Sequence, residues 1–202
     1  MEVIHNAALE FGSPKKVIDI GAGDGMKNSV SKYLIDRGWS AILVEPGENF
    51  KNIPDRENVI KLEVAISIYD GWTTFLINDI CPDHSRIPND IYYSKKFNDT
   101  PTRKVMVKCI TLRSLFEAYP DFKDVGVLSI DTEGFDESIL EMLMRTSVRP
   151  DIILVEHQHS KERIERQKEI LTPYVFIRNV GVNSLFFNEN FKNIPNNEKY
   201  KL

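Results

Sequence analysis

The sequence has few cysteines, no excess of positive charge and no long apolar run, and each shortage excludes a class of protein. The 202 residues include two cysteines, too few for a disulfide framework. Cys81 and Cys109 also lack the C-x-x-C spacing of redox and zinc motifs, so we expect a reducing compartment. The net charge of −4 disfavours a general nucleic-acid binder, which usually carries a basic face.

Apolar segments are short throughout the chain. None approaches the ~20 residues that cross a bilayer, so we expect no membrane span. Residues 1–6 lack the basic stretch and apolar core of a secretory signal. Together with the cysteine content, these absences predict a cytoplasmic protein.

The pattern of apolar residues predicts one α/β domain over residues 1–202. Short β-branched runs alternate with segments of helical periodicity, which is typical of a parallel sheet with helices on both faces. Strands are expected at 16–20, 40–44, 59–68, 72–77, 104–110, 125–130, 151–155, 174–178 and 184–187. Helices are expected at 2–11, 26–37, 111–119, 135–145 and between Ser160 and Pro173.

Some segments do not follow this alternation. Asp70-Gly71 is a strong hairpin signal, so the runs on either side of it are expected to pair. Residues 78–103 are rich in Pro, Asn, Asp and Ser and too long for a simple connection, which predicts a substrate loop. The hairpin and this loop form an insertion around 68–104. Residues 1–15 are an N-terminal lead, and 188–202 are a tail that we expect to fray.

Acidic residues follow several of the expected strands. Right-handed crossovers bring the carboxyl ends of parallel strands to one edge, where ligands bind. The glycine turn 21–25, Glu45, Asp131 and the pair Glu156-His157 all lie at such ends. The sequence therefore predicts an enzyme site at this edge.

The glycine turn favours one nucleotide cofactor over another. The nicotinamide fingerprint is G-x-G-x-x-G, and Met26 stands where its third glycine belongs. Asp24 precedes the expected helix and would repel a pyrophosphate. Asp19 and Asp24 instead suit the cationic sulfonium of S-adenosylmethionine, whereas Glu45 would fit the ribose of either cofactor. A nicotinamide-dependent oxidoreductase and a non-catalytic Rossmann-like binding protein are the alternatives.

Six stretches of the chain resemble the FkbM family of class I methyltransferases. The most specific are Ile130-Asp131-Thr132-Glu133-Gly134 and Thr111-Leu112-Arg113-Ser114-Leu115. In order, the six stretches are 17–23, 43–46, 64–67, 110–115, 128–134 and 150–156. Family members usually have Asp where Arg113 stands and Lys where Ser129 stands, so the details of substrate binding do not transfer.

The resemblance implies a fold, a cofactor and a reaction. The fold is a seven-stranded, mostly parallel sheet with a reversed last strand. S-adenosylmethionine is the methyl donor, and the acceptor is a hydroxyl of a sugar or a secondary metabolite. The positions carried over to cofactor binding are Asp19, Gly21, Ala22, Gly23, Asp24 and Gly25 for the methionine half, Glu45 and Pro46 for the ribose, Ala65 and Ile66 for the adenine, and Asp131 for the methyl group.

Two further side chains are candidates for the cofactor carboxylate. Asn28 and Ser29 stand in the first turn of the expected helix, where a side chain and an amide could bind an anion. Helix capping explains them almost as well.

Methyl transfer to an alcohol also needs a group that removes the hydroxyl proton. Asp131, Glu133, Glu156 and His157 are candidates, and imidazole titrates near physiological pH. His157 could equally be a buried histidine satisfied by the backbone. The carboxylates of Asp131, Glu133 and Glu156 could instead hold Mg²⁺ or Ca²⁺, although Glu133 could simply favour a helix N-terminus.

The expected partner is a small-molecule or carbohydrate acceptor, selected by residues 78–103. The short lead covers little of the site, so a partner subunit could complete the pocket in a homo-oligomer. Residues 161–169 have the charge pattern of an ordinary exposed helix face.

Overall fold

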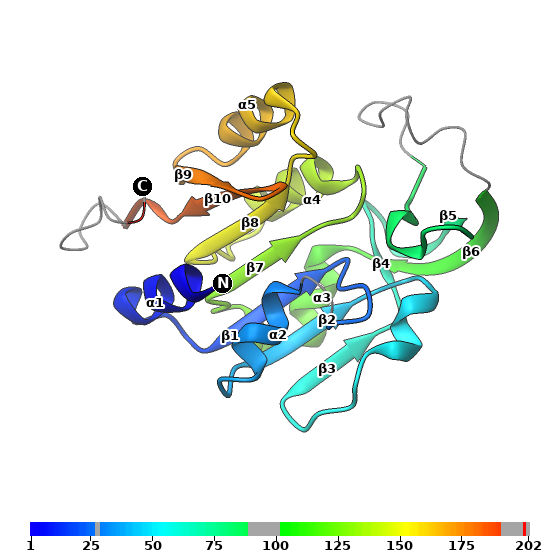
Figure 1. Ribbon diagram of the computed structural model, residues 1–202, viewed down its shortest axis with the longest axis horizontal. Coiled ribbons are helices and arrows are strands. Elements are labelled where there is room, and N and C mark those ends of the chain that lie inside the picture. Colours follow the sequence, from blue (N-terminus) through cyan, green and yellow to red (C-terminus); the bar gives the residue numbers. More distant parts are fainter. Residues whose placement is uncertain (27–28, 89–101, 191–199, 201–202) are drawn as a thin grey trace.

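A seven-stranded sheet forms the centre of the computed structural model, which describes residues 1–26, 29–88, 102–190 and 200. The strand order is β3-β2-β1-β7-β8-β10-β9, with helices on both faces (Figure 1). The strands are β1 (Lys16–Ile20), β2 (Ser40–Val44), β3 (Val59–Leu62), β7 (Val127–Ile130), β8 (Ile152–Glu156), β9 (Val175–Val180) and β10 (Asn183–Phe187). The α-helices are α1 (Glu2–Phe11), α2 (Val30–Ile35), α3 (Leu112–Ala118), α4 (Asp136–Met144) and α5 (Lys161–Ile170).

Strands β3, β2, β1, β7 and β8 are parallel, and β10 is antiparallel to both of its neighbours. The register places Ile20 of β1 opposite Val44 of β2 and Ile130 of β7. The residues that follow these strands therefore meet at one edge. This arrangement confirms the expected methyltransferase-type α/β fold with a reversed last strand.

Alternate residues of the central strands pack into two separate cores. Val17 and Ile152 face α1 and α2, whereas Ile18 and Ile153 face α3 and α4. Because side chains alternate along a strand, an unbroken apolar run fills both cores at once. The strands are thereby fixed between two helical layers, and the sheet edge that they present is rigid.

The insertion forms a second sheet, of order β4-β6-β5, to one side of the main sheet (Figure 1). Its strands are β4 (Ala65–Ile66), β5 (Gly71–Asn78) and β6 (Thr102–Ile110). Strand β5 runs antiparallel to β6, and β4 runs parallel to β6. Short 3₁₀ turns flank the site as η1 (Glu48–Asn52) and η2 (Pro82–His84), and a third, η4 (Pro120–Phe122), precedes β7.

The prediction of a hairpin at Asp70-Gly71 is wrong, because β5 pairs with β6 and not with the segment before it. The Asp70 carboxylate accepts hydrogen bonds from Thr111 N at 2.7 Å and Ser114 Oγ at 2.7 Å, at the start of α3. These bonds tie the beginning of β5 to the end of β6, which becomes its partner in place of the preceding segment. A local turn signal was overridden by side-chain contacts to a distant helix.

Two other expected elements differ in extent. The strand expected at 59–68 is two strands, β3 in the main sheet and β4 in the second sheet. The helix expected at 26–37 begins only at Val30, because Ser29 accepts a hydrogen bond from Lys32 N and caps it. Parts of the expected substrate loop and tail lie outside the described residues. No helix in the described ranges has the length and apolarity needed to cross a membrane.

Candidate active site

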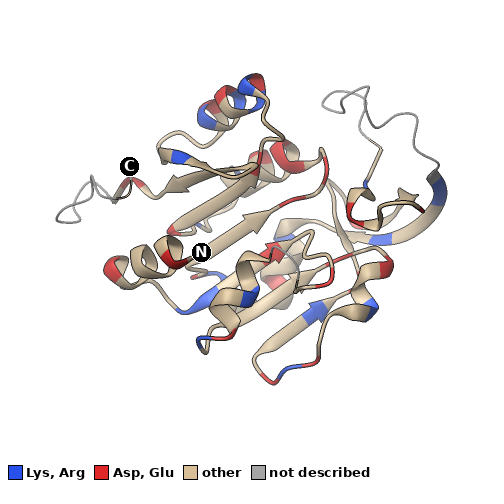
Figure 2. Cartoon of the chain, in the orientation of Figure 1, with Lys and Arg blue, Asp and Glu red and all other residues tan. Residues whose placement is uncertain are grey.

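A pocket of about 430 Å³ opens at the carboxyl edge of the main sheet. It lies where the loops after β1, β2 and β7 meet the last residue of β8, and the second sheet and η2 form its other wall. The lining includes most of the residues expected from the sequence, namely Asp19, Gly21, Ala22, Gly23, Asp24, Ser29, Glu45, Pro46, Ala65, Ile66, Asp131, Glu133 and Glu156. Figure 2 shows acidic residues gathered along the loop between β7 and α4.

The glycine turn packs against the loop that follows β7. Gly21 has a φ of +83°, and a Cβ built there would stand 1.7 Å from the carbonyl oxygen of Asp131. Only glycine permits this approach, because it has both the backbone freedom and the empty space. Gly25 is expected in the pocket but does not line it, since it packs on Leu43 and Ile53.

Glu45 joins the end of β2 to the glycine turn. Its Oε2 accepts a hydrogen bond from Gly23 N at 3.0 Å, and its Oε1 accepts one from Gly47 N at 2.7 Å. Burial is the main reason that the pKa of Glu45 is raised to about 7. The carboxylate is held in the pocket wall with both oxygens oriented.

Asp19 and Ser29 meet through the first turn of α2. Ser31 Oγ donates to Asp19 Oδ2 at 2.6 Å, and the hydroxyls of Ser29 and Ser31 lie 2.7 Å apart. Burial raises the pKa of Asp19. Asp24 accepts a hydrogen bond from Met26 N at 2.8 Å, which orders the end of the turn. Asn28 lies outside the described residues.

Three carboxylates form a cluster at the ends of β7 and β8. Asp131, Glu133 and Glu156 each place one oxygen within 4.8 Å of the others. Burial, with added repulsion from neighbouring carboxylates, raises the pKa of Asp131 well above its usual value, that of Glu133 to about 7 and that of Glu156 to about 10. Glu156 Oε2 is buried and accepts no hydrogen bond from the described residues.

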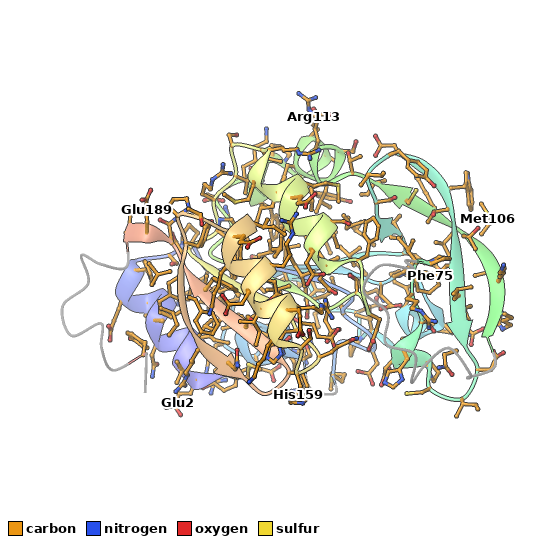
Figure 3. All side chains as sticks on the ribbon, turned by 90° about the horizontal axis from the view of Figure 1, so that it is seen from above. Glu2, Phe75, Met106, Arg113, His159 and Glu189 are labelled. Carbon is orange, nitrogen blue, oxygen red and sulfur yellow. The ribbon has the colours of Figure 1, made fainter. Side chains whose placement is uncertain are left out.

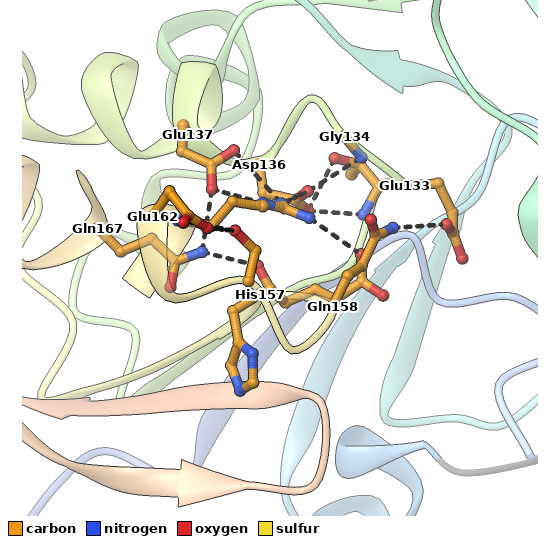
Figure 4. A network of polar contacts seen from close by, with 12 residues as sticks. Glu133, Gly134, Asp136, Glu137, His157, Gln158, Glu162 and Gln167 are labelled. Atoms are coloured by element: carbon orange, nitrogen blue, oxygen red, sulfur yellow. Dashed lines mark hydrogen bonds and ion pairs between the residues drawn. The ribbon is translucent and has the colours of Figure 1, made fainter. Parts of the chain in front are cut away.

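The loop after β7 holds Glu133 in an unusual backbone conformation. Its φ is +56°, the left-handed region that non-glycine residues seldom adopt. Its carboxylate accepts a hydrogen bond from Gln158 Nε2 at 3.0 Å, a contact visible in Figure 4. Gln158 and His159 also have positive φ values, so left-handed residues occur on both loops that meet here.

His157 does not line the pocket. Its Nδ1 accepts a hydrogen bond from His159 N at 3.0 Å, and burial lowers the pKa of its ring. Figure 4 shows the imidazole turned away from Glu133 and Asp136. The geometry agrees with a structural histidine at a strand end and gives no support to His157 as the base.

The chain matches the model of a known protein family. A model of the methyltransferase FkbM domain matches residues 19–189. The chain belongs to this family. No curated protein matches the chain.

A solved structure of a methyltransferase FkbM from Methylobacillus flagellatus KT has the same fold as this FkbM-family chain. The two share 14% sequence identity with a TM-score of 0.50. The match covers 86% of this chain and 43% of the other, so this chain spans less than half of that protein.

Two positions at which the chain departs from the usual FkbM pattern have different surroundings. Arg113 projects into solvent from α3 (Figure 3) and forms an ion pair with Glu117 at 3.4 Å. Ser129 is buried, lines the pocket and contributes a hydrogen bond to Asp19. The first departure is therefore on the surface, and the second lies inside the site.

Sequence reasoning missed two groups of residues in this FkbM domain. Helix α5 was expected to be exposed, and Figure 2 shows charges of both signs on it, but Arg163 and Gln167 are buried. Their spacing of four residues places both on one face, a signal that the surrounding charges obscured. The other is Asn49 of η1, which lines the pocket outside any predicted site segment. Asp83, His84, Ser85 and Ile87 also line it; they lie within the substrate loop expected at 78–103, but no single residue of that loop was predicted.

Gly21→Ala tests the close approach of the glycine turn to Asp131. The new Cβ has no room and forces an unfavourable φ, so we expect a loss of at least about 3 kcal/mol in the free energy of unfolding. Gly12→Ala is the matched control, because Gly12 also has a positive φ but no atom within 4 Å of the position that a Cβ would take; it should cost about 1–2 kcal/mol. Urea denaturation measures both, and equal losses would contradict the packing described.

Proposed function

We propose that this FkbM-family domain is an S-adenosylmethionine-dependent O-methyltransferase. One observation carries the proposal: the pocket is lined by carboxylates and, among the described residues, by no lysine or arginine. A cationic sulfonium is attracted to such a pocket, whereas a pyrophosphate is repelled. The same observation disfavours the nicotinamide alternative.

The lining residues supply a place for each part of the cofactor. The glycine turn and Asp19 would contact the methionine half, and Glu45 would accept hydrogen bonds from the ribose hydroxyls. Ala65 and Ile66 are buried and apolar, as a surface for the adenine requires. Ser29 already caps α2, so its hydroxyl would reach the cofactor only by sharing that role.

Methyl transfer is an in-line displacement in which the acceptor oxygen attacks the methyl carbon and the C–S bond breaks. S-adenosylhomocysteine leaves, and the hydroxyl proton must pass to a base. Alignment of oxygen, carbon and sulfur can contribute roughly 7–11 kcal/mol. We assign the proton to the carboxylates of Asp131 and Glu133, which line the pocket where His157 does not.

The acceptor would lie between these carboxylates and the wall formed by Asp83, His84, Ser85 and Ile87. A pocket with this many acidic groups favours neutral or cationic acceptors over anionic ones. A hydroxyl of a sugar or a secondary metabolite meets this requirement. A homo-oligomer that completes the pocket stays a prediction from the sequence.

Calorimetric titration with S-adenosylhomocysteine and with NAD⁺ tests the cofactor. We expect only the former to bind, and Asp131→Asn to leave its Kd within a few-fold. With an acceptor found by screening extracts for transfer of a radiolabelled methyl group, Asp131→Asn should lower kcat about 100-fold or more. Binding of NAD⁺ alone would overturn the proposal, and equal losses in kcat and affinity would make Asp131 a binding residue.

Glu45 should make cofactor binding depend on pH. The carboxylate accepts the ribose hydroxyls, and with its pKa raised to about 7 it becomes protonated as the pH falls through that value. The Kd for S-adenosylhomocysteine should therefore rise below pH 7. Glu45→Gln should weaken binding about 10- to 100-fold and reduce this dependence to what Glu133, whose pKa is also raised to about 7, contributes. Glu48→Gln, nearby but outside the pocket lining, is the control, and an unchanged Kd in Glu45→Gln would refute the placement.

The three-carboxylate cluster supports a second, separate proposal, that it binds a divalent cation. Glu156 Oε2 is a buried oxygen with no hydrogen bond from the described residues, and carboxylate oxygens are the donors that Mg²⁺ and Ca²⁺ prefer. A cation there would lower the pKa of a bound acceptor hydroxyl.

Treatment with EDTA tests the cation. We expect it to abolish methyl transfer, and added Mg²⁺ to restore it, while binding of S-adenosylhomocysteine changes little. Glu156→Gln should raise the Mg²⁺ concentration needed for half-maximal activity, with Glu141→Gln on the exposed face of α4 as control. Full activity in EDTA would exclude the cation and leave proton transfer to the carboxylates alone.

A further inference from the structure

Arg163 on α5 lies in a buried network outside the lining of the pocket. Its Nη2 donates to Asp136 Oδ2 at 2.6 Å, and its Nε donates to Glu137 Oε1 at 2.9 Å. All three side chains are nearly inaccessible, with exposed fractions of 4%, 0% and 2%. Figure 4 shows Asp136 and Glu137 on α4 with Gln167 of α5 beside them.

Asp136 connects this network to the loop between β7 and α4, which contains Asp131 and Glu133. Its Oδ1 accepts hydrogen bonds from Thr132 N at 2.7 Å and Thr132 Oγ1 at 3.0 Å, and its Oδ2 accepts one from Gly134 N at 3.1 Å. These amides flank Glu133 on both sides. A left-handed conformation at a non-glycine residue persists only when its surroundings hold it, and the Asp136 carboxylate is placed to do so.

The same helix also contacts the end of β8. Arg163 Nη1 makes no hydrogen bond to any described residue and lies 3.7 Å from Glu156 Oε2. Gln167 Nε2 donates to the carbonyl oxygen of Glu156 at 2.7 Å and to Glu137 Oε1 at 3.0 Å. Helix α5 therefore contacts the end of β8 directly and the loop after β7 through Asp136.

The charges around Arg163 account for its burial. Asp136 and Glu137 are too deeply buried to be hydrated, so two carboxylates side by side need a cation between them. A guanidinium suits this position better than an ammonium, since it offers donors in several fixed directions and reaches Asp136, Glu137 and Glu156 together. An ion pair needed for stability alone would not have to contact Asp136, which holds the loop after β7, and Glu156 at the same time.

We propose that Arg163 is a positioning residue for methyl transfer: through Asp136 and opposite Glu156, it fixes the three carboxylates in their reactive arrangement. The proposal rests on the proposed function for its effect on turnover. Its effect on the loop between β7 and α4 is independent of that function.

Arg163→Lys and Arg163→Gln test the proposal, with Arg166→Gln as control, because Arg166 lies on the same helix, is exposed and pairs with Glu141 and Glu169. In Arg163→Gln we expect kcat to fall at least tenfold with the acceptor KM and the Kd for S-adenosylhomocysteine within about twofold. Arg163→Lys keeps the charge and should recover part of kcat. Arg166→Gln should match the wild type in each measurement.

Hydrogen exchange gives a readout that needs no activity. In both Arg163 variants, a peptide covering residues 131–135 should exchange at least tenfold faster, because the amides of Thr132 and Gly134 lose a fixed acceptor. A peptide from β10 should exchange as in the wild type. Should Arg163→Gln fail to fold, Arg163→Lys carries both measurements.

Three results would overturn the proposal: an unchanged exchange rate at 131–135, a rise in exchange that is uniform along the chain, or losses in kcat and cofactor affinity of equal size. The last two results would mean that the ion pairs of Arg163 only stabilise the fold. A wild-type protein that binds no S-adenosylhomocysteine would overturn the proposed function, and the exchange measurement would still decide whether Arg163 holds the loop.

Discussion

Repulsion between carboxylates at one edge of the sheet is the constraint on which the site depends. Asp131, Glu133 and Glu156 crowd together, and Asp136 and Glu137 lie just behind them. Arg163 is the cation that contacts this group within the described part of the chain. With one buried positive charge among five acids, burial and mutual repulsion raise the pKa values of Asp131, Glu133 and Glu156. A ligand that brings positive charge would favour their ionised forms.

The parallel register of the strands brings the residues at their carboxyl ends together around one pocket. Strands β1, β2, β7 and β8 end together, so the residues after each strand meet although they are far apart in the sequence. Gly21 lets the first of these loops lie directly against the third. The two helical layers keep the strands from shifting, and the loops can therefore hold strained backbone without loss of the fold.

The main sheet and its reversed last strand followed from apolar periodicity and from the family resemblance. Most of the predicted site residues line the pocket, because they lie at or just after the end of a strand. The second sheet did not, because Asp70 is bonded to Thr111 at the start of α3, a contact between residues 41 apart that no local pattern encodes. Arg163 was missed for a similar reason. Its neighbours in the sequence are charged and exposed, and only the packing of α5 on α4 shows which face is buried. His157 occupies the expected strand end, but its ring is oriented by a hydrogen bond from His159 N, which spacing alone does not encode.

Strand β4 has two residues, Ala65 and Ile66, which line the pocket and also pair with Cys109 and Ile110 of β6. The wall proposed to contact the adenine is thus continuous with the sheet whose β5 leads into the proposed acceptor wall. Natural variation or grafting of this insertion from another member of the family is free to alter β5 and the segment after it. Any such replacement must preserve the short β4–β6 ladder. Otherwise a change made to alter acceptor specificity will also displace Ala65 and Ile66, which are proposed to contact the adenine.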